Sequence, residues 1–120
     1  MKEIAKVTLP ILRITPGNGP NSEQWARVKD YPSAGDHTRI RIVENNKHGL
    51  VCREGNHRLA IITKNLGLFA VITVTQVEDD DDEYFWDDMV SEAREFGIHT
   101  FEDFWKAAIE GRFVNTGKWS

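Results

Sequence analysis

The segment from Leu50 to Thr75 constrains the fold most, because three different patterns follow one another in it. Leu50 to Arg53 is a short apolar run that predicts a strand. From Asn56 to Leu66 the apolar residues recur at helical spacing, and Gly67 stands where a helix commonly ends. Leu68 to Thr75 is a continuous apolar, β-branched run, typical of a central strand buried on both faces. Strand, helix and strand together predict a crossover unit whose two strands can run parallel, with the helix packed on one face.

One strand and one short helix are predicted at the N-terminus. Ile4 to Ile14 is rich in β-branched and apolar residues, which favour a strand. The turn formers from Thr15 to Pro20 should end this strand. Asn21 or Ser22 can then cap a helix that we expect to continue to about Lys29.

A hairpin is predicted between this helix and the crossover unit. Thr38 to Val43 alternates polar and apolar residues, so it should form a half-buried strand with Arg39 and Arg41 on its exposed face. Asn45 to Gly49 supplies the turn before the strand that begins at Leu50.

Two helices are predicted after the crossover unit. The first carries Trp86 and Phe96 on its apolar face and ends at Gly97, and the second begins with a capping-box pattern at Thr100 and ends at Gly111. The last nine residues are expected to form an arm, whose Trp119 docks on another surface. Three further tryptophans occupy apolar helix faces and are expected to pack in the core: Trp25, Trp86 and Trp105.

The predicted fold class is α+β, with a small mixed sheet of four strands and two C-terminal helices. At 120 residues the chain should be one domain, but its charge is divided unevenly. Residues 1–76 carry eleven Lys and Arg against six Asp and Glu, whereas residues 77–120 carry four against thirteen. The basic core suits a phosphate-bearing ligand, and the acidic helical extension suits a basic protein partner at Glu78 to Asp88 or an intramolecular lid. The alternative is that Asp79 to Glu83 is a solvated helix entrance.

Several functional classes are disfavoured by composition. No run approaches the roughly 18 apolar residues of a membrane-spanning helix, and the first residues lack the apolar stretch of a signal peptide, so we expect a cytoplasmic protein without a membrane partner. The single cysteine, Cys52, lies in an apolar run and should be a buried, inert thiol. The four histidines lack metal-ligand spacing, so no metal site is predicted, and Asp79 to Asp82 would hold Mg²⁺ or Ca²⁺ only weakly.

The residues that carry chemistry lie where the strand at Leu50 to Arg53 turns into the helix that begins at Asn56. We call Gly55 to Arg58 the box. The first turn of a helix presents unpaired backbone N–H groups and the positive end of the helix dipole, so it attracts anions. Gly55 would let a ligand approach the backbone, and Arg58 would reach back as a fork-shaped donor. The other predicted ligand-binding side chains are Asn56 and His57 in the box and Arg39, Arg41 and Arg53 on the neighbouring strands.

Glu54, directly before the box, and His57 within it are the candidate catalytic groups. Each feature also has a purely structural interpretation. Asn56 could simply cap the helix, and Glu54 could form an ion pair with Arg53 or Arg58.

The same residues resemble the ParB/sulfiredoxin-like superfamily. In that superfamily a strand leads into a Gly-x-x-Arg or Gly-Cys-His-Arg box at a helix start, and the helix ends near Leu-Gly before another strand. Here the matching residues are Glu54-Gly55-Asn56-His57-Arg58, then Leu66-Gly67 and the strand Ala70-Val71-Ile72-Thr73-Val74. The resemblance covers about Thr38 to Gln76. It implies a phosphate site lined by Gly55, Asn56, His57 and Arg58, with ATP or CTP and Mg²⁺ as candidate ligands.

Two departures from this superfamily narrow the expected function. The reactive cysteine of sulfiredoxins is matched here by Asn56, which disfavours reduction of a sulfinic acid. The 44 residues after Gln76 are acidic and too few for the DNA-binding and dimerisation domains of partition proteins. Two hypotheses therefore stay open. The chain binds a nucleotide or nucleic-acid phosphate at the box, with or without phosphoryl-transfer or nuclease activity, or it is a non-catalytic module of a phage or mobile element whose acidic segment engages a basic host protein.

Overall fold

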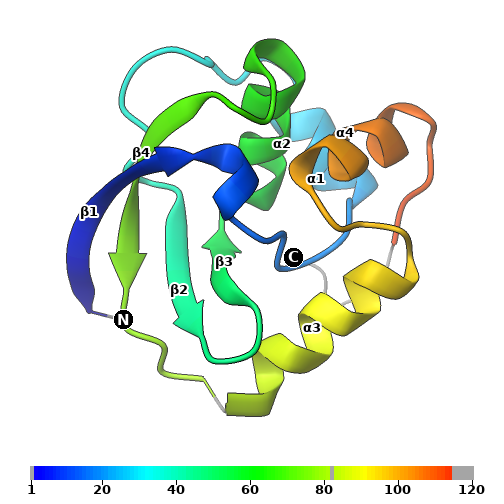
Figure 1. Ribbon diagram of the computed structural model, residues 1–120. Coiled ribbons are helices and arrows are strands. Elements are labelled where there is room, and N and C mark those ends of the chain that lie inside the picture. The colour runs from blue at the N-terminus through cyan, green and yellow to red at the C-terminus, as the bar shows by residue number, and fades with distance from the viewer. Residues whose placement is uncertain (1, 82, 115–120) are drawn as a thin grey trace.

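Four strands form one mixed sheet in the order β1-β4-β2-β3 in the computed structural model, which describes residues 2–81 and 83–114 (Figure 1). β1 pairs with β4 and β2 pairs with β3 in antiparallel fashion, whereas β2 and β4 run parallel. The α+β class and the mixed sheet are confirmed. The strands span Glu3–Pro10 (β1), Arg41–Asn45 (β2), Gly49–Glu54 (β3) and Val71–Val77 (β4).

The two strands of the crossover unit are not parallel, although their sequence pattern allowed it. β2 lies between β3 and β4, and because β2 is parallel to β4 and antiparallel to β3, the two crossover strands run in opposite directions. The parallel partner of β4 is the first strand of the hairpin, with Arg41 opposite Thr75. The central position predicted for β4 is confirmed, although its first residue, Val71, is exposed.

Three strands are shorter at one end than predicted, and one of them is β4, which begins at Val71 instead of Leu68. β1 ends at Pro10, and the next three residues form the 3-10 helix η1 (Ile11–Arg13). β2 begins at Arg41 instead of Thr38. The residues before β2 still lie alongside β4. The Thr75 N–H donates to the Ile40 carbonyl, and the Thr75 hydroxyl donates to the Thr38 carbonyl.

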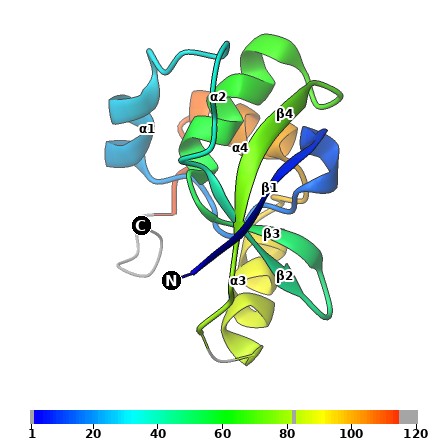
Figure 2. The same ribbon diagram turned by 90° about the vertical axis from the view of Figure 1, so that its left-hand side faces the viewer.

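The helices of the described residues gather at two ends of the molecule (Figures 1 and 2). α1 and α4 both contact α2, and α3 lies at the opposite end beside the hairpin of β2 and β3. None of these helices is both long enough and apolar enough to cross a membrane. Their bounds are Ser22–Val28 (α1), Asn56–Leu66 (α2), Glu83–Glu95 (α3) and Phe101–Ile109 (α4).

Local sequence signals set the helix ends. α2 has the predicted bounds, and the N–H of Gly67 closes its last turn on the Thr63 carbonyl at 2.7 Å. Asn21 caps α1 by accepting a hydrogen bond from the Gln24 N–H. The capping box at Thr100 is present at the start of α4.

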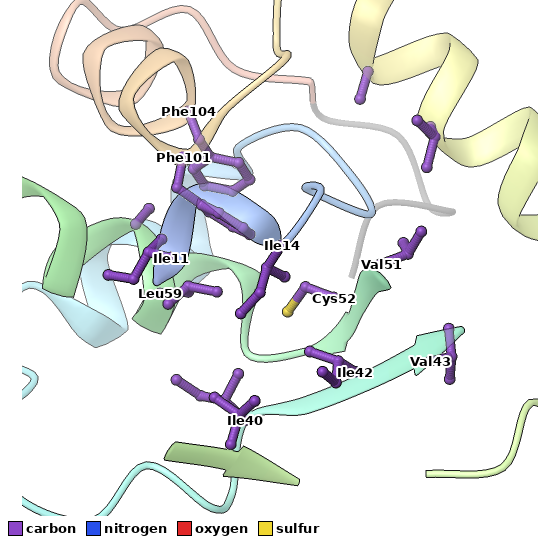
Figure 3. Close-up of a cluster of buried hydrophobic side chains, with 14 of the residues drawn as sticks. Ile11, Ile14, Ile40, Ile42, Val43, Val51, Cys52, Leu59, Phe101 and Phe104 are labelled. Atoms are coloured by element: carbon purple, nitrogen blue, oxygen red, sulfur yellow. The ribbon is translucent and has the colours of Figure 1, made fainter. Parts of the chain in front are cut away.

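The core lies between the sheet, α2 and the C-terminal helices. Figure 3 shows a cluster made by Leu59 of α2, Phe101 and Phe104 of α4, Ile11 at the start of η1 and Ile14 directly after η1. Trp86 is buried and Trp25 and Trp105 pack against the core, as predicted for them. The expectation for Trp119 concerns a part of the chain outside the described residues.

Candidate functional site

A cavity of about 580 Å³ opens over the first turn of α2. One wall is built by α1 and the residues after it, including Arg27, Asp30 and Tyr31. Six of the eight predicted site residues line the cavity: Arg39, Glu54, Gly55, Asn56, His57 and Arg58. Arg41 and Arg53 lie outside its lining.

Gly55 is required by the backbone and by packing. Its φ of 96° lies in the left-handed region, and a Cβ there would meet Ile40 Cγ1 at 2.9 Å. The space that the missing side chain leaves is thus filled by the isoleucine. Packing against Ile40 is therefore one reason for a glycine here, and the Gly55 backbone also borders the cavity; its approach by a ligand stays a prediction.

Asn56 holds the chain together behind the cavity. Its Oδ1 accepts a hydrogen bond from the Gly17 N–H at 2.9 Å, and its Nδ2 donates to the Cys52 carbonyl at 3.1 Å. The side chain is buried and makes no capping bond to α2. Asn56 therefore ties the start of α2 to Gly17 and Cys52 and does not cap the helix with its side chain.

His57 is also buried, and its Nε2 accepts a hydrogen bond from the Asn21 N–H at 2.9 Å. The ring packs edge-on against Phe104, with the ring centroids 5.0 Å apart. Burial lowers the pKa of His57 to about 4, so the ring is neutral at pH 7. A proton could be taken up at Nε2 only if the bond to Asn21 were broken first.

Three arginines supply the positive charge of the cavity: Arg27, Arg39 and Arg58. Within residues 2–81 and 83–114, no carboxylate lies within 4.0 Å of any of these guanidinium groups. Arg58 lies over the ring of Tyr31, 5.8 Å from its centroid, and both residues line the cavity. The first turn of α2 adds the positive end of its dipole to the same wall.

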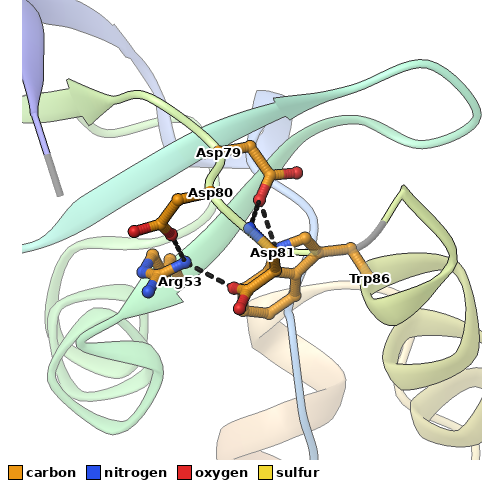
Figure 4. Close-up of polar contacts among 5 residues, drawn as sticks. All are labelled: Arg53, Asp79, Asp80, Asp81 and Trp86. Atoms are coloured by element: carbon orange, nitrogen blue, oxygen red, sulfur yellow. Dashed lines mark hydrogen bonds and ion pairs between the residues drawn. The ribbon is translucent and has the colours of Figure 1, made fainter.

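The two remaining predicted arginines are paired with carboxylates. Arg41 donates to Glu54 Oε2 at 2.8 Å. Glu54 is therefore paired with Arg41 instead of with Arg53 or Arg58, the two predicted partners. Arg53 contacts the carboxylates of Asp80 and Asp81 in the acidic segment (Figure 4). Arg39 and Arg41 do not share an exposed strand face, because Arg39 precedes β2 and Arg41 is half-buried.

Cys52 is buried, and its thiol donates a long hydrogen bond to the Glu54 carbonyl. Burial, with a smaller contribution from the Glu54 carboxylate, raises the pKa of the thiol far above its usual value. The predicted buried placement is confirmed.

Asp79, Asp80 and Asp81 bring carboxylate oxygens within 4.8 Å of one another, and they form the one group of possible metal ligands among the described residues. Two of these carboxylates already contact Arg53. The geometry therefore explains the cluster without a cation.

The sequence alone did not indicate that α1 and the residues directly after it form one wall of the cavity. Gln24, Arg27, Asp30 and Tyr31 lie in no recognisable motif, and only the fold brings them to the box, some 30 residues away. Comparison of the chain with protein-family models, with curated proteins and with solved structures returned no match.

Proposed function

We propose that this chain is a small member of the ParB/sulfiredoxin-like superfamily that binds phosphate groups of a nucleotide or nucleic acid in the box cavity. One observation carries the proposal: Arg27, Arg39 and Arg58 face one cavity without a carboxylate partner among the described residues. Arg41 and Arg53, by contrast, are paired. Arginine forks and a helix N-terminus are the groups that bind phosphate oxygens best.

The cavity is large enough for a nucleotide such as ATP or CTP with its Mg²⁺, because small-ligand sites typically enclose about 300 to 1,000 Å³. Tyr31 and Arg58 offer flat surfaces for a base, and Asp30 offers an acceptor for a hydroxyl or amino group. These features support a nucleotide over a bare phosphate ion.

The arrangement supports binding more than phosphoryl transfer or nuclease chemistry. The Nε2 lone pair of His57 is engaged by Asn21, and Glu54 shares Oε2 with Arg41. General acid–base catalysis needs a group that can reach the reacting atom and exchange its proton. Glu54 is the better of the two catalytic candidates, because its side chain remains partly exposed at the cavity.

A thermal-shift screen tests the proposal, because a ligand that binds only the folded state raises the melting temperature. ATP, CTP, GTP and short oligonucleotides should be compared with and without Mg²⁺. Arg58→Ala should weaken the bound ligand by about 1.5 to 3 kcal/mol, the range for a charge-assisted hydrogen bond. Arg13→Ala removes an exposed arginine outside the cavity and should leave affinity almost unchanged. Equal losses in both variants, or no ligand at all, would contradict the proposal.

A second candidate is the non-catalytic module that engages a basic protein through Glu78 to Asp88. It is supported by the exposed aromatic residues Tyr84 and Phe85, which are 63% and 41% exposed next to these carboxylates. Salt-sensitive binding of an oligolysine peptide that is lost in the Tyr84→Ala, Phe85→Ala double variant would favour this candidate. Binding that is unchanged in the double variant would depend on charge alone and would speak against this candidate.

A further inference from the structure

Arg53, like Arg41, is a predicted phosphate ligand that lies outside the lining of the box cavity. Its Nη1 lies 3.1 Å from Asp80 Oδ1 and 2.5 Å from Asp81 Oδ2 (Figure 4). The Arg53 side chain is 19% exposed. Two carboxylates therefore occupy Nη1 of the guanidinium, which could otherwise donate hydrogen bonds to phosphate oxygens.

The segment that supplies these carboxylates, which we call the acidic strap (Glu78 to Asp81), is anchored by hydrogen bonds at Glu78 and Asp79. The Glu78 N–H donates to the Lys2 carbonyl at the end of β4. Asp79 Oδ1 accepts hydrogen bonds from the indole Nε1 of the buried Trp86 at 3.3 Å and from the Asp81 N–H at 3.1 Å. These contacts tie the strap to the residue before β1 and to α3, and its ion pairs with Arg53 join it to β3.

The strap lies next to the proposed phosphate site. Glu54 lines the box cavity and also a smaller cavity of about 260 Å³ whose walls include Arg53 and Asp81. An anionic chain that continues out of the box cavity past Glu54 would thus meet Arg53. With the strap in place, it meets two negative charges for one positive charge.

We propose that the acidic strap is an autoinhibitory contact that competes with an extended polyanion for Arg53. This inference rests on the proposed function and concerns the regulation of the same site. A mononucleotide fits in the box cavity and leaves the strap in place, whereas a single-stranded oligonucleotide gains Arg53 only when Asp80 and Asp81 are released. Asp80 is 52% exposed and Asp81 34% exposed, so these ion pairs are weak enough to exchange.

Binding of a short oligothymidylate to charge-neutral variants tests the inference. The double variant Asp80→Asn, Asp81→Asn should bind it about fivefold more tightly than the unaltered chain, which corresponds to about 1 kcal/mol. The control, Asp88→Asn with Glu95→Gln, removes two exposed carboxylates of α3 that do not contact Arg53. Adding Arg53→Gln to the first variant should abolish the gain. Equal gains in the two charge-neutral variants, or no gain, would overturn the inference.

Labelling of Arg53 by phenylglyoxal, followed by peptide mass spectrometry, reports on the strap without any ligand. Labelling should be several-fold faster in the Asp80, Asp81 variant than in the control. Unchanged labelling overturns the inference even if the box binds nucleotides. Faster labelling with no binding of nucleotide or oligothymidylate by any variant overturns the proposed function and, with it, the regulatory role of the strap. Should the double variant not fold, Asp80→Asn alone serves for the same comparison.

Discussion

The imidazole Nε2 of His57 accepts a hydrogen bond from the backbone N–H of Asn21 at 2.9 Å. This bond joins the first turn of α2 to the residue that caps α1, and the two helices form two walls of the box cavity. A residue that the sequence suggests for chemistry therefore shapes the site by holding its walls together.

The stability of the protein should fall between pH 6.5 and pH 4 because of His57. Its pKa is about 4 in the folded state and near 6.5 when unfolded, so in this window only the unfolded chain binds the proton. The free energy of unfolding then decreases as the pH falls, by about 3 kcal/mol for a shift of this size. Urea unfolding at a series of pH values measures it.

Two glutamine variants identify the source of this loss. His57→Gln removes the titrating group, and its stability should depend much less on pH in the same window. His48, which is partly buried beside α3, also has a pKa lowered by burial, so His48→Gln is the matched control and should keep most of the loss. A pH profile that is unaffected in His57→Gln would contradict the role assigned to this ring.

Asn56→Ala should destabilise the fold by about 2 to 4 kcal/mol. The substitution leaves the Gly17 N–H and the Cys52 carbonyl without their buried partner, and each such loss costs about 1 to 3 kcal/mol. Asn65→Ala on the same helix removes an exposed hydrogen bond to Ser33 and should cost less than about 1 kcal/mol. Chemical denaturation measures the loss of stability in both variants. Equal losses would show that the buried hydrogen bonds of Asn56 do not stabilise the fold.

Three glycine-to-alanine substitutions should separate steric from conformational costs. Gly17→Ala would place a Cβ 2.2 Å from the Cys52 carbonyl oxygen, so it should cost about 3 kcal/mol or more. Gly55→Ala combines a positive φ with a contact of 2.9 Å to Ile40 and should cost about 2 to 3 kcal/mol. Gly35→Ala has a positive φ in open space and should cost about 1 kcal/mol. Melting temperatures in any other order would contradict these assignments.

Cys52 should react with a thiol reagent only as fast as the protein unfolds. The thiol is buried and its pKa is raised. In the native state a reagent therefore cannot reach the sulfur, and the sulfur is not ionised to the reactive thiolate. Cys52→Ser should leave ligand binding intact and cost about 1 to 3 kcal/mol of stability, because a hydroxyl is buried in its place. Modification of the native protein within the mixing time would instead revive a redox function.

The elements that the sequence determined by itself are those whose signals lie within a few residues. α2 runs from Asn56 to Leu66 as predicted, because its apolar spacing and the glycines at both ends act locally. The capping box at Thr100 is equally local, since a side chain and a backbone N–H three residues apart satisfy each other. The α+β class follows from the order of such elements.

Only the tertiary structure decided which of these elements lie side by side in space. β4 pairs with β2 and not with β3, because the pairing depends on how the whole sheet buries its faces, and no single segment carries that information. The same holds for the site. The box lies at a helix start, as its local pattern indicates, but the backbone N–H groups that donate to Asn56 and His57, those of Gly17 and Asn21, come from a loop almost forty residues earlier. A polar side chain that is buried takes the nearest partner in space, so its role is set by the fold that surrounds it.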